Sequence, residues 1–204
     1  MQGQLWIVAA PSGGGKTSLI AEAVRVLDDV VESVSHTTRA ARPGEVEGVH
    51  YFFVPPERFQ AMVDADGFLE YAQVFHNAYG TAAASVDALL AAGKDVILSI
   101  DWQGAQQVMR RRPQTRTVFL LPPSLDVLRA RLTARGQDNA AVVEKRMAEA
   151  EEQISHYREF EFVIVNEDFQ RAAGELQALI LCDRLRRARC EADLQPLLKR
   201  LGQE

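Results

Sequence analysis

The sequence is poor in cysteine, and its two cysteines do not form a recognisable site. Cys182 and Cys190 are eight positions apart on a segment that predicts one helix. A disulfide between them would strain that helix, and two cysteines alone do not hold a metal ion. The 13 glycines and 8 prolines are an ordinary content for 204 residues, which excludes collagen and low-complexity disorder. A chain of this length can bury a core without disulfide staples.

The sequence also lacks a long apolar run and an excess of basic charge. The first apolar run, residues 5–10, ends at Pro11 and is too short for a signal peptide, and no stretch approaches the ~20 residues of a membrane span. The 23 basic and 28 acidic residues give a net charge of −5. This charge excludes a protein held to nucleic acid mainly by bulk electrostatics. We therefore expect a cytoplasmic protein that binds neither nucleic acid nor membranes.

Apolar runs typical of strands alternate with helical patterns along most of the chain. The runs expected to form buried strands are residues 5–9, 95–100, 117–121 and 162–165. The helical periods cover residues 17–27, 85–92, 104–111, 124–134 and 140–157, and from Asp168 the chain reads as helical almost to its end. This alternation predicts an α/β fold with a central parallel sheet flanked by helices.

Two segments interrupt the alternation. In residues 35–84, short strand-like runs at 51–54 and 68–72 surround a helical stretch at 56–64, which predicts an inserted mixed α/β lobe. Residues 125–157 are helical, rich in arginine and broken at Gly136, which predicts a helical lid region. The core then consists of residues 1–34, 85–124 and 158–204, the last ending in a helical tail, and all segments form one catalytic unit.

The segment Ala10–Thr17 predicts a phosphate-binding loop between a strand and a helix. Its glycines permit positive φ and close approach, so that backbone N–H groups and the helix N-terminus can face a polyphosphate. Lys16 would reach the β and γ phosphates, and the Thr17 hydroxyl would bind Mg²⁺. Ala10 departs from the general pattern, which usually begins with glycine. The residues expected to bind ATP here are Ser12, Gly13, Gly14, Gly15, Lys16, Thr17 and Ser18.

Such a loop serves ATPases, GTPases and kinases alike, so the inserted lobe must decide the reaction. Arg39 and Arg42 are three apart among hydroxyl side chains, and together they could hold a phosphomonoester through charge-assisted hydrogen bonds. Tyr51 and Tyr79 could add neutral O–H donors. These residues predict a site for a second, phosphorylated substrate.

One carboxylate in the lobe suggests which base that substrate carries. Glu70 lies in an otherwise apolar strand-like run. A carboxylate can accept hydrogen bonds from both N1–H and the N2 amino group of guanine, whereas adenine lacks this pair of donors. Ser35 and Thr81 could complete the contacts with the base.

With these motifs in their order, the chain resembles the guanylate kinases, which phosphorylate GMP with ATP. The segments that carry the resemblance, besides Gly48 and Tyr51, are residues 10–17, 35–45, 68–70, 79–81, 100–104, 121–124, 135–136 and 163–166. The resemblance implies a P-loop kinase core with a GMP-binding lobe and a lid. It also implies ATP with GMP or dGMP as substrates and Mg²⁺ as the cofactor.

The resemblance further implies residue roles. Ser35, Glu70 and Thr81 would read guanine, and the GMP phosphate would be held by Arg39, Arg42, Tyr51 and Tyr79. Asp101, at the end of a buried strand, would serve the metal or GMP, and it also suits a helix N-cap. Asn166 would lie near the adenine of ATP. The residues implied in catalysis are Lys16, Arg39 and three lid arginines, Arg131, Arg135 and Arg146.

Two positions depart from the family pattern. Ser99 stands where the family usually carries an acid, two residues before Asp101, and Ala78 replaces a residue that is often aromatic. Either change could lower the rate or the affinity, but neither removes a residue that the proposed chemistry requires.

Other functions fit fewer of these residues. A related kinase acting on another small phosphorylated substrate would leave Glu70 without a purpose. A non-catalytic binding module would need neither Lys16 nor the lid arginines, and a regulatory GTPase would need switch segments that the sequence does not display. In the tail, Leu194, Leu197, Leu198 and Leu201 share one helix face. That face either packs on the core or joins copies in a homo-oligomer, and the sequence does not decide between the two.

Overall fold

The apolar runs form the strands of a parallel sheet in the computed structural model, which describes residues 2–74, 76–134 and 140–202. A strand buried on both faces is continuously apolar, as residues 5–9 are, each of which is buried. Neighbouring strands in the sheet are all parallel, and Leu5 pairs with Val96 while Trp6 pairs with Arg116. The order of the five strands is β2 (Val30–Glu32), β7 (Asp95–Ser99), β1 (Leu5–Ala9), β8 (Arg116–Leu121) and β9 (Phe162–Val165). The predicted α/β class is therefore confirmed.

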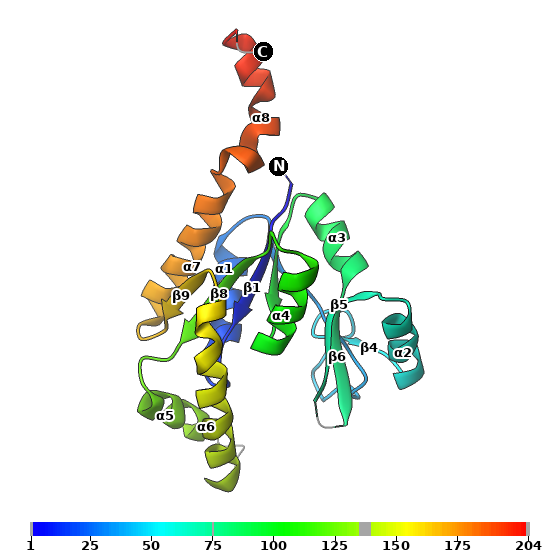
Figure 1. The fold of residues 1–204 in the computed structure, drawn as a ribbon, viewed down its shortest axis with the longest axis vertical. Helices are drawn as coiled ribbons and strands as arrows, with labels where there is room; N and C mark the ends of the chain where they lie inside the picture. Colours follow the sequence, from blue (N-terminus) through cyan, green and yellow to red (C-terminus); the bar gives the residue numbers. More distant parts are fainter. Residues whose placement is uncertain (1, 75, 135–139, 203–204) are drawn as a thin grey trace.

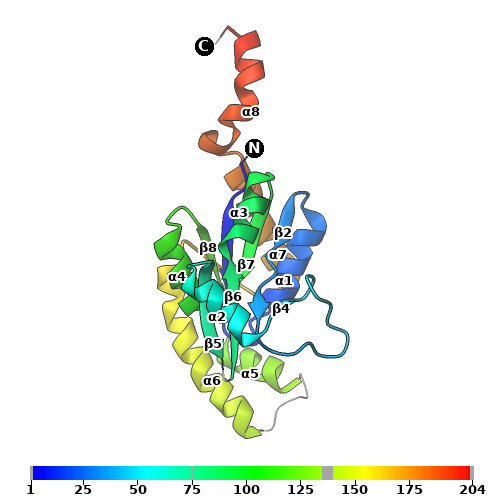
Figure 2. The same ribbon diagram turned by 90° about the vertical axis from the view of Figure 1, so that its right-hand side faces the viewer.

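Helices cover both faces of this sheet (Figures 1 and 2). Because side chains alternate along a strand, β1 supplies both cores: Trp6 and Val8 pack on one face, and Ile7 packs on the other. The helices are α1 (Lys16–Val26) and α7 (Phe169–Arg184) on the first face, with α3 (Ala83–Ala91) and α4 (Trp102–Arg111) on the second. This packing fixes the carboxyl ends of β1 and β7, after which the phosphate-binding loop and Asp101 follow.

A second sheet forms from residues 36–82. Its strand order is β4 (Phe52–Phe53), β3 (His36–Thr37), β6 (Asn77–Ala82) and β5 (Phe68–Val74). The helix α2 (Pro56–Asp64) has the bounds that the sequence predicted, and its Phe59 stacks on Phe68 with ring centroids 4.6 Å apart. Three strands were not predicted, β2, β3 and β6, because each is short or lacks a run of large apolar residues.

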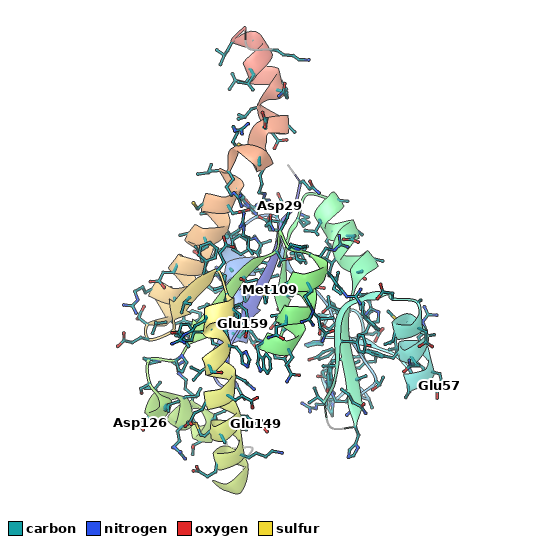
Figure 3. The ribbon with its side chains drawn as sticks, in the orientation of Figure 1. Asp29, Glu57, Met109, Asp126, Glu149 and Glu159 are labelled. Carbon is teal, nitrogen blue, oxygen red and sulfur yellow. The ribbon has the colours of Figure 1, made fainter. Side chains whose placement is uncertain are left out.

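Two helices lie beyond the carboxyl ends of the core strands, α5 (Leu125–Ala134) and α6 (Ala140–Ser155). They pack on each other through a small apolar cluster that includes Leu128, Leu132 and Met147. A 3₁₀ turn follows α6, and its His156 ring stacks on Trp102 of α4 at 3.5 Å. Figure 3 shows Asp126 and Glu149 on this pair of helices and Glu57 on α2, on the two sides of the same end of the molecule.

The C-terminal stretch forms two helices rather than one. The helix α7 ends at Arg184 and α8 (Arg187–Arg200) begins after a short break, so Cys182 and Cys190 lie on different helices, and both are free thiols. The helix α8 extends away from the core, at the end opposite α5 and α6 (Figure 1). The structure describes all of α8, and none of its residues is buried. Among the described residues, no helix combines the length and apolarity needed to cross a membrane.

Candidate active site

The phosphate-binding loop leaves its helix end open. Gly13 and Gly15 have φ of 86° and 90°, the left-handed region that favours glycine. Gly15 is the N-cap of α1, and among the described residues no side chain caps this end of the helix. The free N–H groups and the helix dipole together form a binding site for an anion.

Lys16 lies beside the carboxyl end of β7. Its Nζ donates to the carbonyl oxygen of Ile100 at 2.9 Å. Removal of the ammonium from water lowers the pKa of Lys16 to about 8, and the nearby carboxylates of Asp101, Glu32 and Glu70 oppose this shift. The cation is thus placed where the strands β1 and β7 end, next to the open helix terminus.

The side chain of Asn166 contacts the backbone of the phosphate-binding loop. Its Nδ2 donates to the carbonyl oxygen of Gly14 at 2.8 Å, and a Cβ on Gly15 would lie 2.3 Å from the same nitrogen. Asn166 is buried, and its backbone carbonyl oxygen accepts a hydrogen bond from Nη2 of Arg131 at 2.9 Å. The sequence suggested a contact with adenine for Asn166, and no signal in the sequence indicated this bond to the loop.

The three residues expected to read guanine lie together. The Thr81 hydroxyl donates to Oε1 of Glu70 at 2.6 Å, and the Ser35 hydroxyl lies 3.4 Å from that of Thr81. Glu70 is 6% exposed, and burial raises the pKa of its carboxyl, with Asp101 adding to the shift and Thr81 and Lys16 opposing it. The register of β5 and β6 pairs Glu70 with Thr81, which explains their contact.

Asp101 lies between the core strand β7 and the helix α4, which approaches Glu70. It is the N-cap of α4 and accepts from the Gly104 N–H at 2.8 Å, the bond that the sequence suggested. A Cβ on Gly104 would lie 3.0 Å from Oε2 of Glu70. The glycine therefore lets the first turn of α4 approach the Glu70 carboxylate closely.

Arg39 is paired within the lobe. Its two terminal nitrogens donate to the Glu45 carboxylate at 2.9 and 2.8 Å, and Glu45 also accepts from the Arg42 N–H at 2.7 Å. These donors lower the pKa of Glu45 to about 2. The Arg39 guanidinium lies 5.5 Å from the ring centre of Tyr51, whose ring is 5.9 Å from that of Tyr79. Glu45 was not predicted as a site residue, although it ends the Arg-containing segment on which the resemblance rests.

One cavity connects the lobe with the core. Its volume is about 320 Å³, and its walls include Thr17 of α1 together with Ser35, Tyr51 and Thr81 of the lobe. Thr17 at the end of the loop and two of the three predicted guanine readers, Ser35 and Thr81, therefore line the same space, and Thr81 also contacts the third, Glu70.

Of the arginines expected in the lid region, two lie on described helices, Arg131 on α5 and Arg146 on α6. Arg131 reaches Asn166, as described above, and is partly buried. Arg146, on α6, is also partly buried. Arg135 lies outside the described residues. A further contact of α6 was not predicted: the Ser12 N–H donates to Oε1 of Gln153 at 3.2 Å.

This layout is that of the P-loop kinases, which hold a nucleotide's phosphates on the loop at the end of a parallel strand and transfer one of them to an acceptor. Comparison of the sequence with family models identifies the particular family. The sequence model described as guanylate kinase matches residues 2–182, and the chain belongs to the guanylate kinase family.

Relatives of known name agree along nearly the whole chain. The guanylate kinase of Alkalilimnicola ehrlichii is 53% identical, over 98% of this chain and 99% of that protein. The guanylate kinase of Salmonella typhimurium is 50% identical over 98% of both chains. The crystal structure of guanylate kinase from Anaplasma phagocytophilum superposes with a TM-score of 0.72 at 31% identity, covering 92% of this chain and 89% of that one.

Proposed function

We propose that this chain transfers the γ-phosphoryl group of ATP to GMP, and to dGMP, giving ADP and GDP or dGDP. The observation that carries the proposal is the hydrogen bond from Thr81 to Glu70, because Thr81 and Ser35 line the same cavity as Thr17 at the end of the loop. A carboxylate there can accept from N1–H and the N2 amino group of guanine together. Membership of the guanylate kinase family supports the same activity.

ATP would bind at the open N-terminus of α1. The loop N–H groups would surround the phosphates, and Lys16 would balance their charge. Thr17 lines the cavity and offers a hydroxyl oxygen of the hard kind that Mg²⁺ prefers, so it would hold the ion. Among the described residues, no group of three acidic, His or Cys side chains could hold a metal by itself, so the ATP phosphates and water would supply its other ligands. When bound, Mg²⁺ would neutralise charge that develops on the phosphates.

GMP would bind between the two sheets. Glu70, Thr81 and Ser35 would hold the base, and Arg39, Arg42, Tyr51 and Tyr79 would hold the phosphate. Asp101 lies at the junction, where it can contact GMP while it caps α4. The fork between Arg39 and Glu45 implies a competition, because the dianionic phosphate must draw the guanidinium away from a carboxylate that already holds it.

Phosphoryl transfer then needs alignment and positive charge. An oxygen of the GMP phosphate forms a bond to the γ-phosphorus in line, while the bond from that phosphorus to the departing ADP oxygen breaks. No general base is required, because the GMP phosphate is already anionic near pH 7. Lys16, Arg39 and the lid arginines Arg131, Arg135 and Arg146 would stabilise the moving charge, and closure of the lid region would exclude water.

The test is a coupled assay of ADP release with Mg²⁺–ATP and a panel of acceptors: GMP, dGMP, AMP, CMP, UMP and ribose bisphosphate. We expect turnover of GMP and dGMP, a loss of about 100–1,000-fold in Lys16→Ala, and a shift toward AMP in Glu70→Gln. Binding of GMP without any turnover would favour a non-catalytic module instead. Turnover of the sugar phosphate alone would assign the lobe to a different acceptor.

We also propose that α8 joins copies of the chain. Leu194 and Leu197 of α8 and Leu201 at its C-cap are 38%, 42% and 62% exposed, which leaves the predicted apolar face open. Sedimentation velocity should show an oligomer that dissociates when Leu194 and Leu197 are both replaced by Lys. A monomer at all concentrations would contradict this proposal.

A further inference from the structure

The strand β7 ends in Ser99, at a position where the resemblance to the guanylate kinases implies an acid. Ser99 occupies that position, and it lines the cavity together with Thr17. If the acid had a task at the ATP end of the site, another residue of this chain must perform it or the task is lost. The residues around Ser99 therefore decide what replaces the missing carboxylate.

Glu32 lies on the neighbouring strand and reaches the same place. The strands β2 and β7 are parallel neighbours, Glu32 pairs with Ile97, and the Ser33 N–H donates to the Ile97 carbonyl at 2.9 Å. Ile97 and Ser99 are two residues apart on one strand, so they share a face of the sheet with Glu32. The Glu32 side chain is longer than that of aspartate and can therefore span the diagonal to Ser99.

The surroundings of Glu32 agree with this placement. Glu32 and Ser99 both line the cavity, and the Lys16 ammonium is close enough to act electrostatically on the Glu32 carboxylate. Burial raises the pKa of Glu32, while the Lys16 ammonium and the Ser99 hydroxyl oppose this shift. Among the described residues that line the cavity, the other acid is Glu45, which is already held by Arg39.

We propose that Glu32 supplies from β2 the carboxylate that the family usually carries at position 99, and that Ser99 orients it. Glu32 is then a positioning residue for the ATP half of the site, acting through the Lys16 ammonium and the Mg²⁺ that Thr17 would hold. This inference rests on the proposed function, since it assigns a role in the same reaction.

The test exchanges the acid between the two strands. The variants are Glu32→Gln, Glu32→Val and the double variant Glu32→Val with Ser99→Asp, and Glu57→Gln on α2 is the matched control for loss of one charge. Calorimetry measures the affinity for ATP with Mg²⁺ and with EDTA, and separately the affinity for GMP. The kinetic assay measures kcat and the Mg²⁺ concentration at half-maximal rate.

We expect Glu32→Gln and Glu32→Val to lower kcat and the affinity for Mg²⁺–ATP by about 10–100-fold. Their affinity for GMP should stay close to that of the control, and their loss of affinity for ATP in EDTA should be smaller than with Mg²⁺, because only the contribution through Lys16 remains. The added Ser99→Asp should restore most of the lost affinity and rate. A merely structural role would not be repaired by an acid on a different strand.

Two results would overturn the inference. One is a Glu32→Gln protein that behaves like Glu57→Gln in Mg²⁺–ATP binding. The other is a double variant that folds, as judged by circular dichroism, but recovers nothing. If the wild-type chain failed to phosphorylate GMP, the proposed function would fall, and the calorimetric series with Mg²⁺–ATP would still decide the role of Glu32.

Discussion

Burial disfavours the ionised carboxylate of Glu70, whereas hydrogen bonds from bound guanine would favour it. The residue is 6% exposed, so its carboxylate has lost most of its contact with water, and this burial raises its pKa. The donors of guanine would replace that water. Sequence reasoning found this residue because a carboxylate in an apolar run is conspicuous. It did not find the loop-supporting role of Asn166, because that role is a contact between segments 152 positions apart.

The raised pKa of Glu70 gives a signed pH dependence. Only the ionised carboxylate would accept hydrogen bonds from both guanine donors, so we expect GMP to bind most tightly above the pKa of Glu70 and more weakly as the pH drops through it. That fall should begin above the ordinary value of 4.5 for glutamate. Glu70→Gln should bind GMP about 10–100-fold more weakly near pH 7.

Calorimetric titration with GMP from pH 4.5 to 8 checks this. The GMP phosphate titrates with a pKa near ~6, so the ratio of wild-type to Glu70→Gln affinity isolates the Glu70 contribution. That ratio should shrink at acid pH. A ratio independent of pH would mean that the carboxylate does not bind the base.

Among the elements, those with strong local patterns were predicted and those defined by distant partners were not. The helix α2 has the predicted bounds, and the apolar strand β1 does too. The strand β3 is two polar or half-polar residues, His36 and Thr37, which become a strand because β4 and β6 pair with them on either side. Strand propensity depends on such neighbours, so the local sequence carries little signal there.

Gly104, in the first turn of α4, allows a test of whether GMP binding requires the close approach of this helix to Glu70. Gly104→Ala improves helix propensity but places a Cβ 3.0 Å from Oε2 of Glu70, which Thr81 holds in position. We expect weaker GMP binding with little net change in stability. The control is Gly174→Ala in α7, where a Cβ would meet nothing within 4 Å. It should stabilise the fold by about 0.5–1 kcal/mol and leave GMP binding unchanged. Equal GMP affinities in the two variants, measured by calorimetry, would argue against the close approach.

On the scale of the whole molecule, the two ends have different tasks. The loop, the lobe and the helices α5 and α6 gather at the carboxyl ends of the core strands, while α8 extends from the opposite end (Figure 1). That opposite end holds buried charges: Asp95 and Asp183 are 1% and 5% exposed. Their arginine partners come from several elements, so the network ties the sheet to both C-terminal helices.

Arg189 is the member of this network that belongs to α8. It donates to Asp183 at 2.7 Å and to Asp95 at 2.6 Å, and 10% of its side chain is exposed. Arg189→Met removes one partner from each carboxylate, and each keeps another arginine. We expect a loss of about 1–3 kcal/mol in the free energy of unfolding, measured by urea denaturation.

The matched control is Arg187→Met, two residues earlier on the same helix. Arg187 pairs with Glu191, but 84% of its side chain is exposed, so its removal should change stability by less than ~0.5 kcal/mol. Because the network lies at the end opposite the cavity, both variants should retain the wild-type KM for GMP. A marked change in that KM with Arg189→Met would mean that α8 and the nucleotide site are coupled through the sheet. Equal unfolding free energies for the two variants would show that the buried network does not anchor the C-terminal helix.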